Sequence, residues 1–131
     1  MAMKEETLAG ALLMKSHKEL VGLSRRYLDA FKNKNLDVLK SMFSNDVELI
    51  DWENNIVGFD DVVSFNQDVF SAHKSINIQI KSIKSFPDSL TTQCKILITL
   101  VQKDKQTLSV IDVLTFDDNG LIKKIQAEKI K

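Results

Sequence analysis

The chain has few of the residues that build several common kinds of functional site. Its 131 residues include one cysteine, one proline and four glycines. The single cysteine, Cys94, excludes an internal disulfide, cannot build a zinc site, and suits a reducing compartment. The glycines form no phosphate-binding loop. His17 and His73 have no partner at metal-ligand spacing, so we expect no metal or cofactor, and we expect both histidines to be surface or half-buried residues.

The chain also lacks an excess of either charge and any long apolar run. The 18 basic and 18 acidic residues give a formal net charge of zero. No run of Lys and Arg marks a nucleic-acid groove. No apolar stretch approaches the roughly 20 residues that cross a bilayer. The acidic pair Glu5 and Glu6, ahead of a short apolar stretch, argues against a signal peptide. We therefore expect a cytoplasmic protein with neither a nucleic-acid nor a membrane partner.

The first part of the chain has the apolar spacing of helices. Leu20, Leu23, Tyr27 and Phe31 recur at intervals of three to four residues, which predicts an amphipathic helix over residues 18–34. A second short helix is predicted over 36–43. A third, with Asp60 or Asp61 as its cap, ends near residue 72. A weaker apolar stripe before residue 18 predicts a helical extension over 1–18, packed on a domain that spans 19–131.

The rest of the chain is predicted to be mainly strand. A strand over 47–52 is followed by a turn at residues 53–55. From residue 75 onward apolar and polar residues alternate, and Asn119-Gly120 predicts a type I′ hairpin turn. Helices first and antiparallel strands afterwards indicate an α+β fold. We expect a curved sheet whose apolar face is covered by the helices, with a pocket between them.

Asp112 is the most informative single residue. Because strand side chains alternate, it shares a face with Leu108, Val110, Leu114 and Phe116, all of them apolar. A buried carboxylate is costly, so such a group is paired, hydrogen-bonded or protonated. Each of these states makes it a candidate for chemistry. The alternative is a structural acid that bonds to a helix end or a neighbouring strand.

The layout resembles the NTF2-like superfamily, which includes the SnoaL-like polyketide cyclases and the ketosteroid isomerases. The segments that carry the resemblance are 26–31, 35–39, 42–47, Gly58 and 111–116, within a span of roughly 19–131. Each segment is weak alone, but their order and spacing match the superfamily. The resemblance implies a cone-shaped α+β fold with a strongly curved antiparallel sheet covered by N-terminal helices.

The resemblance to ketosteroid isomerases also implies roles for three residues. Tyr27 stands where that family has its oxyanion tyrosine, Asp51 where it has its catalytic base, and Asp112 where it has a protonated acid. Such a base removes a proton next to a carbonyl while two donors stabilise the enolate oxygen. The sequence departs from the pattern at Trp52, which replaces the expected proline. If the strand continues, Trp52 alternates away from Asp51, and we then expect it to pack outside the pocket or at an interface.

Several alternatives remain open at this stage. Tyr27 could be a core residue, and Asp51 could cap the turn that follows it. The first function is a ketosteroid isomerase-like enzyme, or a related lyase or cyclase, that enolises a small apolar ketone. The second is a non-catalytic domain that binds a hydrophobic ligand. The third is a protein-interaction module. Ile111 and Val113 interrupt the polar outer row of their strand, so we also expect a homodimer through that face.

Overall fold

The structure, a computed structural model, describes residues 16–130, and three α-helices lie in this part of the chain. They are α2 (His17–Lys32), α3 (Leu36–Met42) and α4 (Phe59–Ala72). The Ser16 side chain caps α2 by accepting a hydrogen bond from the Glu19 main-chain N–H at 3.1 Å. The predicted cap of α4 is wrong. Gly58 is its N-cap, and Asp60 and Asp61 lie in the first turn, where negative charge favours the helix dipole.

Six strands form one sheet in the order β2-β1-β6-β5-β4-β3. They are β1 (Phe43–Ile50), β2 (Asn55–Val57), β3 (Ser75–Phe86), β4 (Thr91–Val101), β5 (Lys105–Phe116) and β6 (Ile122–Lys129), with a 3₁₀ turn, Pro87–Ser89, between β3 and β4. All neighbours are antiparallel except β1 and β6, which run parallel. The fold is therefore α+β, as predicted, with one parallel pair in a largely antiparallel sheet.

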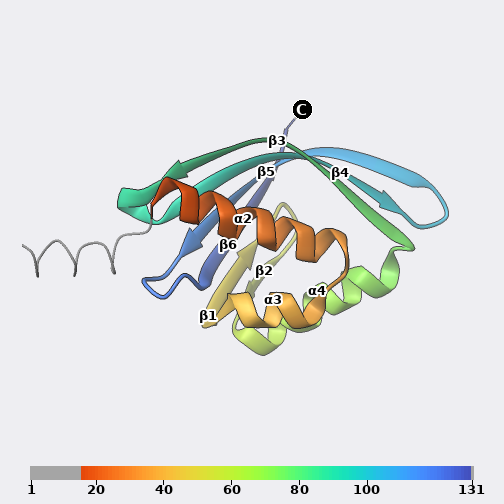
Figure 1. The fold of residues 1–131 in the computed structure, drawn as a ribbon. Coiled ribbons are helices and arrows are strands. Elements are labelled where there is room, and N and C mark those ends of the chain that lie inside the picture. The colour runs from red at the N-terminus through yellow and green to blue at the C-terminus, as the bar shows by residue number, and fades with distance from the viewer. Residues whose placement is uncertain (1–15, 131) are drawn as a thin grey trace, which may run out of the picture.

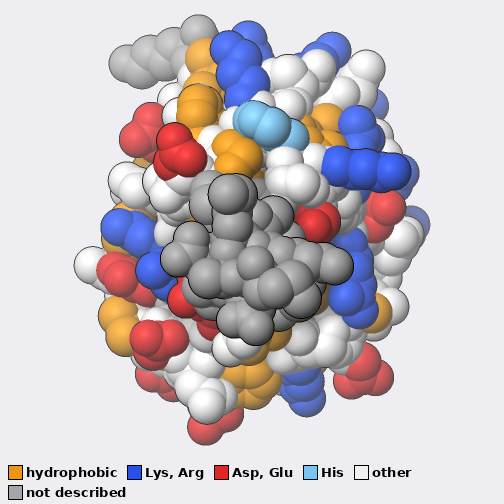
Figure 2. Space-filling view, turned by 60° about the vertical axis from the view of Figure 1, so that its left-hand side comes forward, with side chains coloured by type: hydrophobic (Ala, Val, Ile, Leu, Met, Phe, Trp, Pro, Cys, Tyr) orange, Lys and Arg blue, Asp and Glu red, His pale blue; other side chains and the backbone are white. Residues whose placement is uncertain are grey.

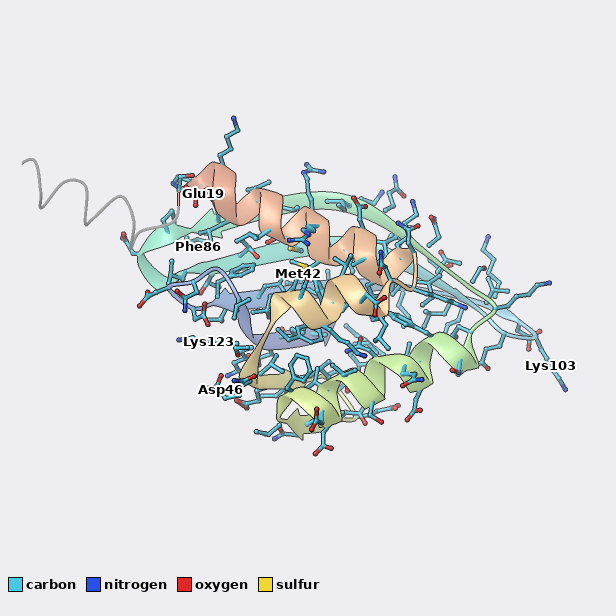
Figure 3. The ribbon with its side chains drawn as sticks, turned by 60° about the horizontal axis from the view of Figure 1, so that its bottom comes forward. Glu19, Met42, Asp46, Phe86, Lys103 and Lys123 are labelled. Atoms are coloured by element: carbon cyan, nitrogen blue, oxygen red, sulfur yellow. The ribbon has the colours of Figure 1, made fainter. Side chains whose placement is uncertain are left out.

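The three helices cover one face of the sheet (Figure 1). In Figure 1 the long strands β3 and β4 arch over α2, while α3 and α4 lie below it. A register shift between Ile80 and Ser82 marks a bulge in β3, and bulges bend and twist the strand that carries them. Figure 3 places Lys103, in the β4–β5 hairpin, at the opposite end of the molecule from Glu19 and Phe86.

Two local predictions differ from the structure. The first strand begins at Phe43, four residues before the predicted start, and ends at Ile50. Asn119-Gly120 does not form a type I′ turn, because Gly120 has a φ of 81° and Asn119 has no positive φ. The Asp117 main chain closes the loop on both sides, since its carbonyl accepts from Gly120 N–H at 3.0 Å and its N–H donates to the Leu121 carbonyl at 2.8 Å. The result is a three-residue hairpin loop with glycine in the left-handed position.

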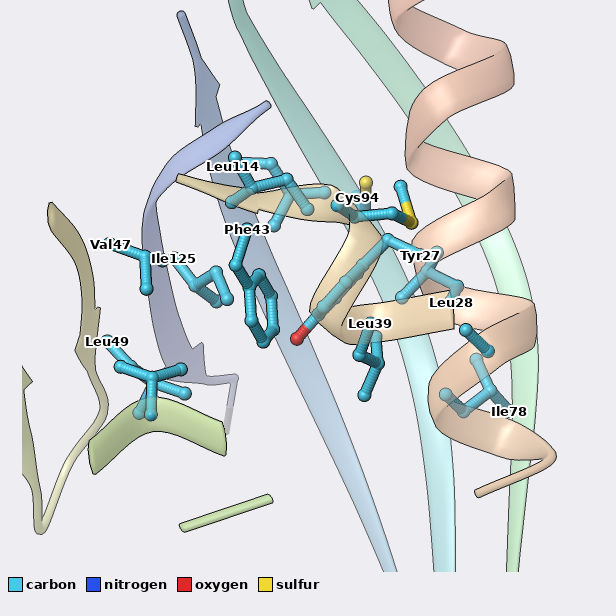
Figure 4. Packing of buried hydrophobic residues seen from close by; sticks show 14 of the residues in the cluster. Tyr27, Leu28, Leu39, Phe43, Val47, Leu49, Ile78, Cys94, Leu114 and Ile125 are labelled. Carbon is cyan, nitrogen blue, oxygen red and sulfur yellow. The ribbon is translucent and has the colours of Figure 1, made fainter. Parts of the chain in front are cut away.

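Of the predicted N-terminal extension, 1–18, residues 1–15 lie outside the described residues. Within residues 16–130, every helix is too short or too polar to cross a lipid bilayer. The core lies between the helices and the sheet (Figure 4). Its fully buried side chains include Leu20 and Leu28 from α2, and Leu114 and Phe116 from β5. The apolar stripe predicted for the first helix and the apolar face predicted for the Asp112 strand therefore meet.

Candidate ligand pocket and active site

A cavity of about 350 Å³ opens between the helices and the concave face of the sheet. Ligand pockets are typically apolar clefts of this order of size, with a small number of polar groups that orient the ligand. The lining of this cavity is likewise mostly apolar, with a few polar side chains. Its apolar walls are formed by Leu28, Phe31, Leu49, Phe65, Val69, Ile78, Ile96, Ile98, Leu100, Leu108, Val110, Ile125 and Ala127.

Tyr27, Asp51 and Asp112 all line this cavity. Tyr27 comes from the buried stripe of α2, Asp51 follows the last residue of β1, and Asp112 comes from the middle of β5. The structure thus brings together three side chains that lie 24 residues or more apart in the sequence. The catalytic roles that the resemblance implies for these three residues remain predictions.

Asp112 is buried, with 9% of its surface exposed. Its cross-strand neighbours are Cys94 on β4 and Ala127 on β6, and neither side chain is hydrogen-bonded to it. No donor in residues 16–130 is hydrogen-bonded to its carboxyl. Loss of hydration disfavours the charged form and raises the pKa of Asp112 from 3.8 to about 7. The carboxyl group can therefore carry a proton near neutral pH and donate it in a hydrogen bond.

Tyr27 extends from α2 into the interior beside Phe43 and Leu39 (Figure 4). Its ring packs between Phe31 and Phe43, with centroid distances of 6.4 and 6.5 Å. Burial, followed by the charges of Asp112 and Cys94, raises the pKa of the Tyr27 hydroxyl well above its usual value. This hydroxyl also has no hydrogen-bond partner among the described residues. It therefore stays protonated and keeps a free donor in the cavity.

Asp51 is held by the turn that follows β1. Its Oδ1 atom accepts hydrogen bonds from the main-chain N–H groups of Glu53 and Asn54, at 2.8 and 2.7 Å. The Asn54 side-chain amide adds contacts of 3.0 Å to Oδ1 and 3.2 Å to Oδ2. Asp51 therefore caps the turn that follows it through Oδ1, which was one of the two interpretations left open by the sequence. Oδ2 has only the longer contact of 3.2 Å, so it is the less engaged of the two oxygens.

The position of Trp52 was predicted wrongly. Because β1 ends at Ile50, strand alternation does not extend to Trp52, and the turn places its side chain on the wall of the cavity. It is 43% exposed, and the Lys129 ammonium lies 4.6 Å from its ring centroid. Asn54 and His73 also line the cavity, although no pattern in the sequence singled out either residue as part of a site. A helix end and a turn bring them there, and neither has a periodicity that could have been used.

Cys94 is the cross-strand partner of Asp112 on β4 and lies next to a buried hydroxyl pair. Its Sγ is 3.8 Å from Thr92 Oγ1, which is 2.7 Å from Ser24 Oγ. Burial is the main reason that the pKa of the Cys94 thiol rises to about 11. A thiol that stays protonated is a poor nucleophile, and we assign Cys94 a structural role.

On the face shown in Figure 2, basic and acidic side chains of the described residues are interspersed. No group of three His, Cys, Asp or Glu side chains in residues 16–130 is placed to hold a metal ion. The cavity is therefore the feature on which a functional argument rests.

Comparison with known proteins gives one family and a set of similar folds. The family model described as the SnoaL-like domain matches residues 24–125. No curated protein sequence matches the chain. Three solved structures illustrate the similarity in fold: an LEH-like epoxide hydrolase from M. tuberculosis, a candidate ketosteroid isomerase from Kribbella flavida DSM 17836, and a candidate SnoaL-like polyketide cyclase from Jannaschia sp. CCS1.

The similarity extends over most of each chain. The epoxide hydrolase has a TM-score of 0.77 at 15% identity, with 87% of this chain and 84% of that chain covered. The isomerase has a TM-score of 0.74 at 17% identity, covering 88% and 80%. The cyclase has a TM-score of 0.76 at 14% identity, covering 88% and 89%. At such low identities these matches show the fold, and the names of these proteins describe three different reactions.

Proposed function

The chain belongs to the SnoaL-like domain family, within the NTF2-like fold, and we propose that it is an enzyme that enolises a small apolar ketone. One observation carries the proposal. Two hydrogen-bond donors, the Tyr27 hydroxyl and the protonated Asp112 carboxyl, line an apolar cavity without a partner among the described residues. Buried polar groups normally have partners, so an unpartnered pair in a cavity favours a ligand that accepts from both. A ketone oxygen accepts two hydrogen bonds.

The proposed reaction is a double-bond shift in a β,γ-unsaturated ketone. Asp51, through Oδ2, removes a proton from the carbon between the carbonyl and the double bond. The electron pair of that C–H bond forms the dienolate, whose negative oxygen receives hydrogen bonds from Tyr27 and Asp112. The protonated Asp51 then returns the proton to the γ carbon, which gives the conjugated ketone and restores the carboxylate. No atom or electron is exchanged with a cofactor.

Turnover of a cyclic β,γ-unsaturated ketone tests the proposal, because the conjugated product absorbs in the ultraviolet. We expect Asp51→Asn to lower kcat by about 10²- to 10⁴-fold, the usual contribution of a general base. Tyr27→Phe should lower kcat by about 10²-fold or more through loss of an oxyanion donor. Asp112→Asn keeps a donor and should retain much of the activity. Equal turnover by wild type and Asp51→Asn would reject the mechanism.

Asp51→Asn is a well-matched variant because asparagine preserves the turn. Its side-chain oxygen can accept the two main-chain hydrogen bonds that Oδ1 accepts now. Asp51→Ala removes both and serves as the structural comparison. We expect Asp51→Ala to lower the free energy of unfolding by about 1–2 kcal/mol and Asp51→Asn to change it by less than about 0.5 kcal/mol. Loss of turnover in both variants then reports the missing base and not a collapsed turn.

The hydrogen bonds to Asp51 also favour a second candidate function, binding of an apolar ketone without turnover. Trp52 lines the cavity and is the only tryptophan of the chain, so its fluorescence reports binding directly. This second function would be supported if a ketone binds to the wild type, binds more weakly to Tyr27→Phe, and is converted by neither protein.

A further inference from the structure

We propose that His73 is a specificity-determining residue that accepts a hydrogen bond from a hydroxyl or N–H group at the far end of the ligand. The assignment rests on the proposed function for the position of the ligand's ketone, at Tyr27 and Asp112. It names the substrate class more closely, as an elongated apolar ketone with a donor group at the end opposite the carbonyl.

His73 lies in the walls of two spaces, the apolar cavity and a second, polar hollow. It follows the last residue of α4, is half-buried, and lines both spaces. Leu100 is also shared by the two, so they adjoin at this point. The hollow has a volume of about 400 Å³, and its other lining residues are Gln102, Lys103, Asp104 and Gln106. His73 and Leu100 therefore lie in the walls of both the apolar cavity and a polar region at the β4–β5 hairpin.

The hydrogen bonds of His73 define which ring nitrogen can accept. Nδ1 lies 2.8 Å from the Val69 carbonyl oxygen, which can only accept, so Nδ1 carries the proton. In the neutral ring Nε2 is then an acceptor. It takes a 3.3 Å contact from the Gln102 side-chain amide, and Gln102 is exposed on the hairpin. This contact is long for an N–H donor, so a ligand donor can replace it at little cost.

The main chain around His73 is also fixed. The Lys34 ammonium donates hydrogen bonds to the carbonyls of His73 and Lys74, the second at 3.3 Å. The Lys74 N–H donates in turn to the Val101 carbonyl. These contacts tie the end of α4 to the turn between α2 and α3 and to β4, so the imidazole is held in a fixed position.

The register of the sheet sets the length of the ligand. Cys94 pairs with Asp112 at the deep end of the cavity, and Leu100 lies six residues further along β4. Six residues of strand span about 20 Å between Cα atoms. Side chains from both ends shorten the gap, but a single-ring ketone at Tyr27 and Asp112 would not reach His73. Only an elongated ligand contacts both ends.

A series of probes tests this assignment. Each probe is a cyclohexenone with a straight alkyl arm that ends in either a hydroxyl or a methyl group, with arms of four to ten carbons. Binding is measured by Trp52 fluorescence. We expect the hydroxyl probe to bind about 5-fold tighter than its methyl partner, but only at the arm lengths that reach His73. No hydroxyl preference at any length in the wild type would overturn the proposal.

Variants locate the effect on the imidazole. His73→Leu should remove the hydroxyl preference, measured as the ratio of hydroxyl-probe to methyl-probe affinity at each arm length, and His73→Asn, which retains an acceptor, should restore part of it. Lys103→Gln, in the same hollow, is the matched control and should keep the preference. A preference that survives His73→Leu or disappears in Lys103→Gln would assign the recognition to another residue.

Probes without the ketone separate this inference from the proposed function. Long-chain alcohols and the matching alkanes have no ketone, and an alcohol that places its hydroxyl at Tyr27 and Asp112 would show a preference that does not depend on His73. Suppose that the alcohols bind more tightly than the alkanes, that this difference depends on His73, and that no ketone is turned over. The proposed catalytic function would then be rejected and the His73 assignment kept. Ketone turnover without a hydroxyl preference would keep the enzyme and reject the assignment.

Discussion

The hydroxyl groups of Ser24 on α2 and Thr92 on β4 are joined by a buried hydrogen bond of 2.7 Å. Both residues are fully buried. Ser24 Oγ donates to the Leu20 carbonyl at 2.9 Å, so the proton between the two hydroxyls comes from Thr92. Ser24 lies one helical turn before Tyr27. The bond therefore fixes the distance between the helix that carries Tyr27 and the strand that pairs with the strand of Asp112.

Removal of this bond should destabilise the protein and loosen the site. We expect Thr92→Val to lower the free energy of unfolding by about 1–2 kcal/mol, because the buried Ser24 Oγ would no longer accept a hydrogen bond from residue 92. The double variant Ser24→Ala, Thr92→Val should cost less than the sum of the two single changes. Chemical denaturation of the four proteins measures this coupling. Additive losses would show that the two hydroxyls do not act as a pair.

Asp112 should make stability depend on pH in a specific window. Its pKa is about 7 in the folded protein and 3.8 as an ordinary carboxyl. The folded state therefore binds the proton more tightly. This contribution is fully present below pH 3.8 and is lost as the pH rises through 7. A difference of about three pKa units corresponds to about 4 kcal/mol.

Asp112→Asn isolates this contribution, because the amide cannot ionise and has nearly the same shape. We expect the variant to gain about 4 kcal/mol of stability relative to the wild type between pH 4 and pH 8. Urea unfolding of both proteins across this range is the measurement. In the same interval the pKa of the Asp112 carboxyl can be followed by NMR. A constant difference between the two proteins would mean that Asp112 is charged throughout.

The fold was predictable because the sequence patterns that specify it are long. The helix stripe of Leu20 and Tyr27 and the alternating face of Asp112 each extend over several periods, so burial follows directly from them. The three proposed site residues lie on or directly after such elements, which explains why the structure finds them on one cavity. Local turn chemistry was less predictable. The type I′ expectation for Asn119 failed because the Asp117 side chain accepts from Asn119 N–H and Leu121 N–H, which favours a longer loop.

The rim of the cavity could not be predicted for a different reason. Trp52 follows a strand that ends two residues earlier than expected, so alternation gave the wrong side for its side chain. His73 occupies a helix end, where side-chain direction depends on the tertiary contacts of Lys34 and Gln102. Neither partner is close to His73 in the sequence. Such residues become candidates only when the sheet register is known.

The outer face of the sheet has a pattern that fits a second copy of the chain. Ile111 is flanked by Lys95 on β4 and by Glu128 on β6. Both charged residues are exposed, and Ile111 is half-buried. A two-fold axis along β5 would place each Lys95 opposite the Glu128 of the partner, with the two Ile111 side chains in contact. We therefore expect the homodimer to use this register.

Sedimentation equilibrium tests the homodimer. The wild type should be a dimer at micromolar concentrations, and Ile111→Lys should be a monomer because it introduces a charge at the centre of the contact. Asn77→Lys, an exposed change on β3 of the same sheet, should remain a dimer. Lys95→Glu should weaken the dimer, and adding Glu128→Lys should restore it. A monomeric wild type, or a dimer that survives Ile111→Lys, would exclude this interface.

Asn66 in α4 contains a buried acceptor that no described residue satisfies. The side chain is fully buried, and its Nδ2 donates to the Val62 carbonyl at 2.9 Å, but Oδ1 has no partner. A buried unpaired acceptor costs about 1–3 kcal/mol. Leucine has a similar volume and no polar atom. We therefore expect Asn66→Leu to raise the free energy of unfolding by about 1 kcal/mol, which corresponds to an increase in Tm of about 3–5 °C.

Asn66→Ala provides the matched comparison for this change. It removes the same acceptor but leaves a cavity, so it should lower the free energy of unfolding by about 1–3 kcal/mol. Calorimetry of the three proteins measures both effects, and turnover of the ketone should be unchanged in Asn66→Leu because Asn66 does not line the cavity. A fall in Tm in Asn66→Leu would contradict the prediction, because it would mean that Oδ1 contributes a favourable interaction in the folded protein.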